Sequence, residues 1–375
     1  MNLILGVEAL EPHLSGIGRY TWEMAQRLQT HSDVNRLRFY KNRRWVTDPA
    51  SLVNALTGGK DSPVFLMQTR DRILKKRWVA NIVLPFAFKD YVFHGPNFFL
   101  PPYADVGVIT VHDLSVLKYP QTHPTQRVAQ FERDFVRSVQ AAAQVIADSE
   151  TTRLEVMAYT GLPATRVTAV PLGVAPAFKP RSADELRPVL HAYGLQPGAY
   201  VLCVSTFEPR KKISQLLAAY RTLDVALQRQ YPLVLAGAAG WLNDGLQAEI
   251  AAGQQQGWLV YLGFVPEHDL PYLYAGAASF CYPSVYEGFG LPPIEAMACG
   301  VPTVVANASC LPEVTQGAAL LANPDDIDNL ALALAQSLLD EPWRRAAVSH
   351  GLKVAASYTW DKCVNRTVEV YKKAQ

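Results

Sequence analysis

Short apolar runs alternate along the chain with longer segments in which apolar residues recur at helical spacing. In the first half, these runs predict strands at residues 3–7, 37–40, 91–94, 108–112, 145–148 and 167–170. In the second half, they predict strands at residues 200–205, 233–237, 260–262, 279–282 and 303–306. Helical patterns end the chain at residues 326–339, 342–356 and 360–373. Strands that alternate with helices are typical of parallel sheets, so we predict the α/β class.

The alternation breaks once, near the middle of the chain. Residues 171–176 contain two prolines and a glycine, and a polar stretch to Arg187 follows. A chain of 375 residues is too long for one ordinary core and suits two domains of roughly 150–200 residues. We therefore predict one domain over residues 1–172, a second over 173–356, and a terminal helical segment over 357–375.

Charge is balanced overall but uneven along the chain. The net charge is +2, which does not by itself indicate nucleic acid. Residues 36–89, however, carry twelve Lys and Arg against three acids, mixed with Trp45, Trp78, Phe86 and Phe88. Such a segment is either a solvated face or a surface that docks on anionic lipid. Nucleic acid would use a similar patch, but no other feature supports it, so we expect no nucleic-acid partner.

The five cysteines show neither a CxxC motif nor metal-ligand spacing. Cys203 and Cys281 lie in apolar runs, where cysteine behaves as a small core residue. That usage fits a reducing compartment. The first seven residues lack a basic leader, and no run approaches the eighteen or more apolar residues of a membrane span. We expect a cytoplasmic protein.

The most informative motif covers residues 287–302. Glu287 lies in a turn with two glycines, and two prolines suit the first turn of the helix that follows. Glu295 lies one helical turn inside that helix. Taken alone, Glu295 is equally well explained as a partner of the helix dipole, and Glu287 as a surface turn residue. Together they place two carboxylates beside a helix N-terminus, which suits a ligand with both phosphate and sugar hydroxyls.

This motif resembles the Glu-x7-Glu signature of the retaining glycosyltransferases of family 4, and matching pieces near both ends extend the likeness over almost all of the chain. The resemblance implies the GT-B fold, in which two Rossmann-like domains face each other across a cleft and the last helix returns to the first domain. It also implies that Glu287 holds donor-sugar hydroxyls with help from the backbone at Phe289 and Gly290, and that Glu295 accepts from the ribose. Because a helix N-terminus attracts anions, we assign the N–H groups of Gly290 and Leu291 to the diphosphate.

Two motifs of the first half fit the same family. Gly16 and Gly18 stand between the first strand and a helix, where small residues let a ligand approach the backbone. The family's glycine-rich loop, which faces the donor diphosphate and the acceptor, occupies this place. His112 lies at the end of a strand, where a lone histidine is more often a structural hydrogen-bonding residue. The family has a histidine here that meets the donor sugar; Asp113 either orients its ring or caps the next turn.

Arg210 and Lys211 follow the first strand of the second half. A guanidinium fork beside an ammonium suits a diphosphate, although a solvated basic turn looks the same. The family's Glu-Pro-Arg-Lys-Asn string binds the leaving diphosphate here. Two departures stand out: Lys212 replaces the usual Asn or Gly, and Ser205 aligns with a phosphate-binding arginine of some members. More of the binding should then depend on Arg210 and Lys211.

Asp326 and Asp328 form a D-x-D, which is the metal motif of a different glycosyltransferase fold. They follow Asn323-Pro324 and open a helical pattern, so capping is the better interpretation. We expect no metal and no cofactor other than the sugar nucleotide.

The motifs at residues 16–20, 112–114, 208–211 and 311–314 look most like bacterial mannosyltransferases of O-antigen and related polysaccharide assembly. The resemblance therefore implies a metal-independent, retaining hexosyltransferase that moves mannose from GDP-mannose to a lipid-linked glycan, with contact to inner-membrane lipid as a further hypothesis. Other donors (UDP-glucose, UDP-N-acetylglucosamine, a rhamnosyl nucleotide), a nucleotide-sugar epimerase and a silent binding protein remain alternatives. The expected catalytic residues are His112, Arg210, Lys211 and Glu287, and the expected substrate-binding residues are Gly16, Gly18, Phe289, Gly290, Leu291 and Glu295.

Overall fold

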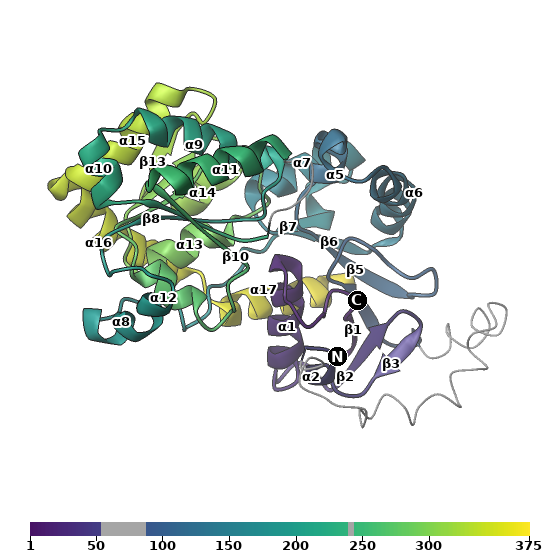
Figure 1. Ribbon diagram of the computed structural model, residues 1–375. Coiled ribbons are helices and arrows are strands. Elements are labelled where there is room, and N and C mark those ends of the chain that lie inside the picture. Colours follow the sequence, from purple (N-terminus) through teal and green to yellow (C-terminus); the bar gives the residue numbers. More distant parts are fainter. Residues whose placement is uncertain (54–87, 239–243) are drawn as a thin grey trace, which may run out of the picture. The chain divides into compact units, whose positions relative to one another are not determined.

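The computed structural model describes residues 1–53, 88–238 and 244–375 (Figure 1). The chain divides into two compact units. Unit 1 comprises residues 1–118, 125–172 and 360–375, and unit 2 comprises residues 119–124 and 173–359. The division after Leu172 coincides with the expected domain boundary, and the last helix begins at Trp360 rather than at 357. Residues 119–124 differ from expectation: the Tyr119 ring packs 5.2 Å from that of Tyr286, which groups them with unit 2.

Unit 1 contains a sheet of seven described strands in the order β3-β2-β1-β4-β5-β6-β7. The strands are β1 (Asn2–Gly6), β2 (Arg36–Lys41), β3 (Arg44–Val46), β4 (Val92–Gly95), β5 (Val106–Val111), β6 (Gln144–Ala147) and β7 (Val167–Ala169). All pairs are parallel except β2 with β3. Strand β3 was not predicted from the sequence. It is joined to β2 by a hairpin turn in which Asn42 and Arg43 have φ of 48° and 66°.

The helices of unit 1 are largely amphipathic and cover this sheet. They are α1 (Gly16–Leu28), α2 (Ala50–Val53), α5 (Ser115–Lys118), α6 (Thr125–Ala141), α7 (Glu150–Thr160), the short 3₁₀ turn η3 (Ala164–Arg166) and α17 (Trp360–Ala374). Helix α17 packs on α1, β5 and β6, so the end of the chain completes the core of its first half. That return was an implication of the family resemblance.

Unit 2 contains a parallel sheet of six described strands in the order β10-β9-β8-β11-β12-β13. They are β8 (Val201–Val204), β9 (Leu233–Ala236), β10 (Leu259–Gly263), β11 (Ser279–Tyr282), β12 (Thr303–Ala306) and β13 (Leu320–Ala322). Of these six strands, only β13, a strand of three residues at the sheet edge, was not predicted from the sequence. Strands β9, β11 and β12 are buried along their whole length, as both faces of a doubly covered parallel sheet require.

Helices cover both faces of the sheet in unit 2 (Figure 1). The helical elements are the 3₁₀ turns η2 (Pro120–Thr122) and η4 (Pro209–Lys211), α8 (Ala183–Ala192), α9 (Ile213–Thr222), α10 (Val225–Gln230), α11 (Asp244–Gln256), α12 (Leu270–Ala275), α13 (Leu291–Ala298), α14 (Leu311–Thr315), α15 (Ile327–Leu339) and α16 (Glu341–Ser357). Helices α9, α11 and α15 pack together, and α13 packs with α12 and α16. The polar stretch that runs to Arg187 forms the first turns of α8, whose N-terminus is closed by a capping box of Ser182 and Glu185.

Both sheets share one topological feature. In unit 1 the strand order reverses between β1 and β4, and in unit 2 it reverses between β8 and β11. Ligands of open α/β sheets bind beyond the carboxyl ends of the strands at such a reversal. The residues that follow β8 and β11, and those that follow β1, β4 and β5, are therefore where a site is expected.

Candidate active site

In unit 2, charged side chains gather at the carboxyl ends of β8 and β11. The segment after β8 carries Arg210 and Lys211 in η4, and the segment between β11 and α13 carries Glu287. Glu287 is 9% exposed and Lys211 is 7% exposed. The structure thus brings together three of the predicted catalytic residues, which we call the charged cluster.

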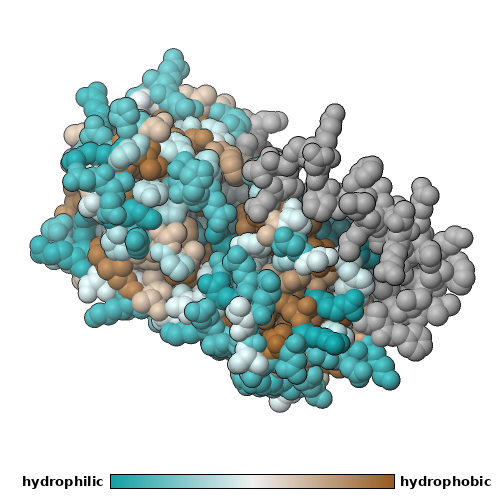
Figure 2. All heavy atoms as spheres, turned by 90° about the horizontal axis from the view of Figure 1, so that it is seen from below, coloured by the Kyte–Doolittle hydropathy of each residue, from teal (hydrophilic) through white to brown (hydrophobic). Residues whose placement is uncertain are grey.

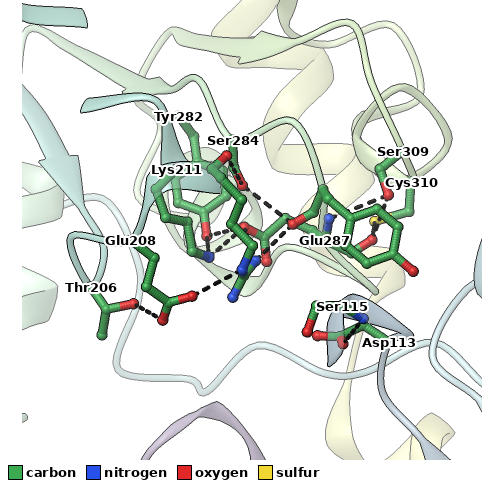
Figure 3. A network of polar contacts seen from close by, with 12 residues as sticks. Asp113, Ser115, Thr206, Glu208, Lys211, Tyr282, Ser284, Glu287, Ser309 and Cys310 are labelled. Atoms are coloured by element: carbon green, nitrogen blue, oxygen red, sulfur yellow. Dashed lines mark hydrogen bonds and ion pairs between the residues drawn. The ribbon is translucent and has the colours of Figure 1, made fainter. Parts of the chain in front are cut away.

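The contacts within the charged cluster meet at one atom, Glu287 Oε1 (Figure 3). Lys211 Nζ donates to this oxygen, and Arg210 Nη1 lies 3.3 Å from it. The Tyr282 hydroxyl, at the end of β11, also donates to it at 2.9 Å. Tyr282 was read from the sequence only as a strand residue, and no motif marks it.

Glu287 and the two cations stabilise each other's ionised forms. Burial alone would raise the pKa of Glu287, but the charges of Lys211 and Arg210 outweigh it and lower the pKa to about 2. Burial lowers the pKa of Lys211, and the charge of Glu287 offsets part of that effect. A carboxylate with so low a pKa is a weak base, so Glu287 is suited to accepting hydrogen bonds rather than protons.

Arg210 is held by a carboxylate that the sequence analysis did not assign. Glu208 is 8% exposed and accepts from Arg210 Nε at 3.0 Å, while Thr206 donates to Glu208 at 2.9 Å. Arg210 Nη1 also donates to the Tyr286 carbonyl at 2.7 Å. The guanidinium is therefore fixed from two sides, because a planar fork can be oriented by separate acceptors. The position of Glu208 two residues before Arg210 was visible in the sequence but gave no signal of this role.

The backbone of Glu287 is fixed by the segment that precedes α14. The Ser309 hydroxyl donates to the Glu287 carbonyl at 2.6 Å and lies 3.3 Å from its N–H. Cys310 Sγ donates to the same carbonyl at 3.2 Å. Ser309 itself has φ of 54°, a left-handed conformation that is uncommon for a residue other than glycine. The side chains of Ser309 and Cys310 thus fix the backbone conformation of the turn that carries Glu287.

Helix α13 begins as its sequence predicts. Gly290 is the N-cap with φ of 89°, and the two prolines lie in the first turn. A Cβ at Gly290 would also lie 2.7 Å from Leu311 Cδ2, but this atom ends a flexible side chain, so the positive φ is the reason that this position favours glycine. Phe289 is buried with its ring edge-on to Tyr358, at 5.3 Å. Leu291 is the first helical residue, so its N–H lacks an intrahelical acceptor.

Glu295 is buried within the same helix, at 8% exposure. Burial raises the pKa of Tyr274 well above its usual value, and the nearby charge of Glu295 raises it further. The structure therefore places this carboxylate beside Tyr274 of α12.

Lys212 explains why the family favours Asn or Gly at its position. It has φ of 54° and ψ of 36°, at the junction of η4 and α9. Asn and Gly adopt this left-handed conformation more readily than lysine. The Lys212 ammonium is 2.6 Å from Asp325 Oδ1, so it points to a surface ion pair. Ser205, the other departure, lies directly after β8, and its backbone oxygen would be 1.9 Å from a Cβ at Gly237.

In unit 1, His112 is the first residue after β5, and its ring is occupied on both sides. Nδ1 lies 2.7 Å from Asp148 Oδ2, and Nε2 lies 2.7 Å from the Pro96 carbonyl. Asp148 is the first residue after β6, the neighbouring strand. Asp148 was not predicted as a site residue, although it and His112 both follow apolar runs at the same edge of the sheet. Asp113 instead accepts from Ser115 N–H at 2.7 Å, which confirms the capping alternative.

Burial alone would lower the pKa of His112, but the charge of Asp148 and the hydrogen bonds to Asp148 and Pro96 outweigh it and raise the pKa. Because the Pro96 carbonyl can only accept, Nε2 donates to it, and Nδ1 donates to the carboxylate. The arrangement therefore favours the doubly protonated ring.

The two predicted glycines of α1 differ in their surroundings. Gly18 N–H donates to Ser15 Oγ at 3.2 Å, and a Cβ at Gly18 would lie 2.9 Å from the Ala9 carbonyl. Internal packing and capping thus account for Gly18. Gly16 is exposed, and a Cβ there would meet nothing within 4 Å. Gly16 is the one of the pair whose surroundings leave room for a ligand.

The D-x-D motif lies at the start of a helix, as the capping interpretation predicts. Asp326 caps α15 through Asn329 N–H at 3.0 Å, so the capping interpretation of the D-x-D is confirmed. Within residues 1–53, 88–238 and 244–375, no group of three His, Cys, Asp or Glu is placed to hold a metal ion. In the same ranges, no helix has the length and apolar character that crossing a membrane requires.

The basic segment at 36–89 is described only at its ends. Trp78 and Phe86 lie outside the described residues, as do the six basic residues between 54 and 87. Phe88 is 1% exposed and packs on Tyr40 and Trp45, so its expected place in a surface patch was wrong. Arg38 lies 3.5 Å above the Trp45 ring, as a cation–π pair.

Known proteins resemble this chain over part or all of its length. The family model of glycosyl transferases group 1 matches residues 194–354. O-antigen chain mannosyltransferase B of Escherichia coli is 38% identical over 382 residues, which cover 99% of this chain and 100% of that protein. The serotype-specific mannosyltransferase WbdA of Escherichia coli is 32% identical over 247 residues, which cover 65% of this chain and 29% of WbdA.

Solved structures share the fold. Anabaena Alr3699/HepE, in complex with UDP-glucose, matches with a TM-score of 0.71 at 17% identity and covers 99% of both chains. The predicted fold, two α/β units with parallel sheets of the GT-B type, is confirmed.

Proposed function

The chain belongs to the group 1 glycosyl transferases, and from this premise we propose that it moves mannose from GDP-mannose to a lipid-linked glycan in O-antigen or related polysaccharide assembly. The observation that carries the proposal is the charged cluster of Arg210, Lys211 and Glu287 at the strand reversal of unit 2. The mannosyl donor and the polysaccharide acceptor are supported by the full-length similarity to O-antigen chain mannosyltransferase B.

In this proposal the cations take the charge that develops on the departing diphosphate. Lys211 has three N–H donors, of which Tyr282 and Glu287 engage two, so one remains for a phosphate oxygen. Arg210 and the N–H groups of Gly290 and Leu291 supply further donors. Preorganised donors of this kind act without a metal ion, because they already face the position where charge accumulates. We therefore propose metal-independent transfer.

Glu287 holds hydroxyls of the donor sugar in this proposal, assisted by the backbone at Phe289, and Glu295 accepts from the ribose. The low pKa of Glu287 supports a role as hydrogen-bond acceptor rather than as general base. Retention of configuration then follows from attack on the face that the diphosphate leaves, with the departing phosphate taking the acceptor's proton. Both ring nitrogens of His112 are engaged by Asp148 and Pro96. We therefore propose that the main chain of His112 contacts the donor sugar, and that its ring holds this main chain in place.

The acceptor suggests a site of action at the cytoplasmic face of the inner membrane. Arg36, Arg43 and Arg44 are exposed at β2 and β3 and would face anionic lipid. Figure 2 shows that hydrophilic residues prevail over much of the face it displays, with apolar groups between them. Adsorption through charge is therefore the expected mode. Cosedimentation with anionic vesicles, lost at high salt and with neutral vesicles, would support it; equal sedimentation with neutral vesicles would contradict it.

The function is tested by incubating the protein with GDP-mannose, UDP-glucose, UDP-N-acetylglucosamine and a rhamnosyl nucleotide, each with and without a lipid-linked glycan. We expect GDP release from GDP-mannose that depends on the acceptor, an α-linked product by NMR, and full activity in the presence of a chelator. Turnover of another donor instead of GDP-mannose would replace the donor assignment. Epimerised nucleotide sugar without acceptor would indicate an isomerase, and loss of activity on chelation would overturn metal independence.

A further inference from the structure

Tyr282 is the last residue of β11 and lies against the charged cluster with 3% of its surface exposed. Its hydroxyl accepts from Lys211 Nζ at 2.9 Å and donates to Glu287 Oε1 at 2.9 Å. The Lys211 ammonium also lies 5.2 Å from the centroid of the Tyr282 ring. Tyr282, Lys211 and Glu287 thus form a closed triangle of hydrogen bonds (Figure 3).

The direction of each bond in this triangle is fixed by chemistry. An ammonium has no acceptor, and an ionised carboxylate has no donor. The single hydroxyl proton of Tyr282 must therefore point to Glu287, and a lone pair of its oxygen must receive Lys211. No other standard side chain offers a donor and an acceptor on one atom at this reach from a rigid ring: serine and threonine are shorter, and phenylalanine has neither.

We propose that Tyr282 is a positioning residue that fixes Lys211 and Glu287 relative to each other for the transfer reaction. Lysine carries its charge on a flexible four-carbon stem, and Glu287 alone would leave the ammonium free to pivot around one oxygen. The Tyr282 hydroxyl removes that freedom and directs the third N–H of Lys211. This inference rests on the proposed function of the charged cluster.

Tyr282 directs an N–H donor of Lys211 at the negative charge that develops on the leaving diphosphate. Its removal should therefore destabilise the transition state more than the complex with bound substrate. Tyr282→Phe should therefore lower kcat by roughly tenfold to a hundredfold, while the KM for the donor changes by less than about threefold. Tyr200→Phe is the matched control, because its buried hydroxyl donates to the Leu273 carbonyl at 2.6 Å and contacts no member of the cluster. It should lose stability but keep kcat.

A double-mutant cycle with Lys211→Met separates positioning from a general loss of structure. If Tyr282 acts through Lys211, adding Tyr282→Phe to Lys211→Met lowers kcat by less than about twofold. Additive losses, or full kcat in Tyr282→Phe, would overturn the inference while the proposed function stands. If the wild-type protein turns over no sugar nucleotide, the proposed function is overturned and this inference with it, so the two failures are distinguishable.

Discussion

The two units organise their buried polar residues in different ways, although the strand order reverses at the same point in both sheets. In unit 1 the Tyr371 hydroxyl lies 2.7 Å from His94 Nδ1, and His94 Nε2 lies 2.8 Å from the Thr110 hydroxyl. Thr110 in turn lies 3.0 Å from the Tyr20 hydroxyl. In unit 2 the corresponding region holds two cations and two carboxylates, Arg210, Lys211, Glu208 and Glu287, all nearly buried.

The difference separates groups that build the fold from groups that are available for chemistry. The chain from Tyr371 to Tyr20 is buried, and burial lowers the pKa of His94 to about 3, so the ring is neutral at pH 7. Each group satisfies its neighbour. Burying four charges is costly even when they are paired, and apolar residues would serve stability as well. Unit 1 buries one such pair, His112 with Asp148, in which each charge satisfies the other. Retaining four charges that converge at a strand reversal therefore indicates function.

The largest effect is expected at Glu287. Glu287→Gln keeps the shape of the side chain and an acceptor oxygen, but it removes the charge on which Lys211 and Arg210 converge. We expect kcat to fall by about a hundredfold to a thousandfold, because the displaced cations no longer bind the leaving diphosphate. Nucleotide release measures kcat, and circular dichroism checks the fold.

The matched control for this variant is Glu369→Gln, which alters an exposed carboxylate that is paired with Lys372 on α17. It should leave kcat unchanged. Retained turnover in Glu287→Gln would remove the distinction between the two units, since the charged cluster would then be structural as well.

Asp148 is the buried carboxylate in unit 1 that corresponds to Glu287 in unit 2. Asp148→Asn should lower the free energy of unfolding by about 3 kcal/mol, because it breaks a buried pair with His112. We expect kcat per folded molecule to fall less than tenfold. Urea titration followed by fluorescence measures the first quantity, and nucleotide release below the transition measures the second. A loss of kcat as large as that of Glu287→Gln would place the His112 ring in the chemistry.

The same pair predicts a pH dependence. The pKa of His112 is raised in the folded protein, so its contribution to stability is fully present below the ordinary histidine value near 6.5. That contribution is lost as the pH rises through the folded pKa. Wild-type stability should therefore decline on the alkaline side of neutrality, and Asp148→Asn should flatten the decline. An equal slope in both proteins would show that another group causes it.

The sequence predicted most of the fold and the ends of the strands that carry the site. Apolar runs marked eleven of the strands, and β3 and β13 were missed because three residues are too few to show a period. Arg210, Lys211 and Glu287 were found because a family motif marks them. Asp148 and Tyr282 were not found, because their partners His112 and Lys211 are distant in sequence. Glu208 lies in the same motif as Arg210, but nothing in the sequence marks it as the acceptor that orients the guanidinium.

A substitution of Tyr371 tests whether the hydrogen-bonded series of neutral groups in unit 1, from Tyr371 to Tyr20, is purely structural. Tyr371→Phe removes the hydroxyl that contacts His94 and leaves one buried ring nitrogen without a partner. The free energy of unfolding should fall by about 1–3 kcal/mol, with kcat unchanged. Thermal unfolding and the donor assay measure the two effects. A change in kcat without a change in stability would contradict the structural role of this chain.

The smallest effect is expected at Lys212, which borders the charged cluster but points away to Asp325. Lys212→Asn gives up a surface ion pair worth about 0–1 kcal/mol and gains a residue that tolerates φ of 54°. The melting temperature should stay level or rise slightly, and kcat should be retained. Lys212→Ala is the matched variant, because it loses the ion pair without gaining the backbone preference, and it should melt below the Asn variant. If Ala and Asn melt alike, the left-handed conformation does not limit stability here. If both lose activity, Lys212 belongs with Arg210 and Lys211 as a third cation for the diphosphate, and the charged cluster extends to the start of α9.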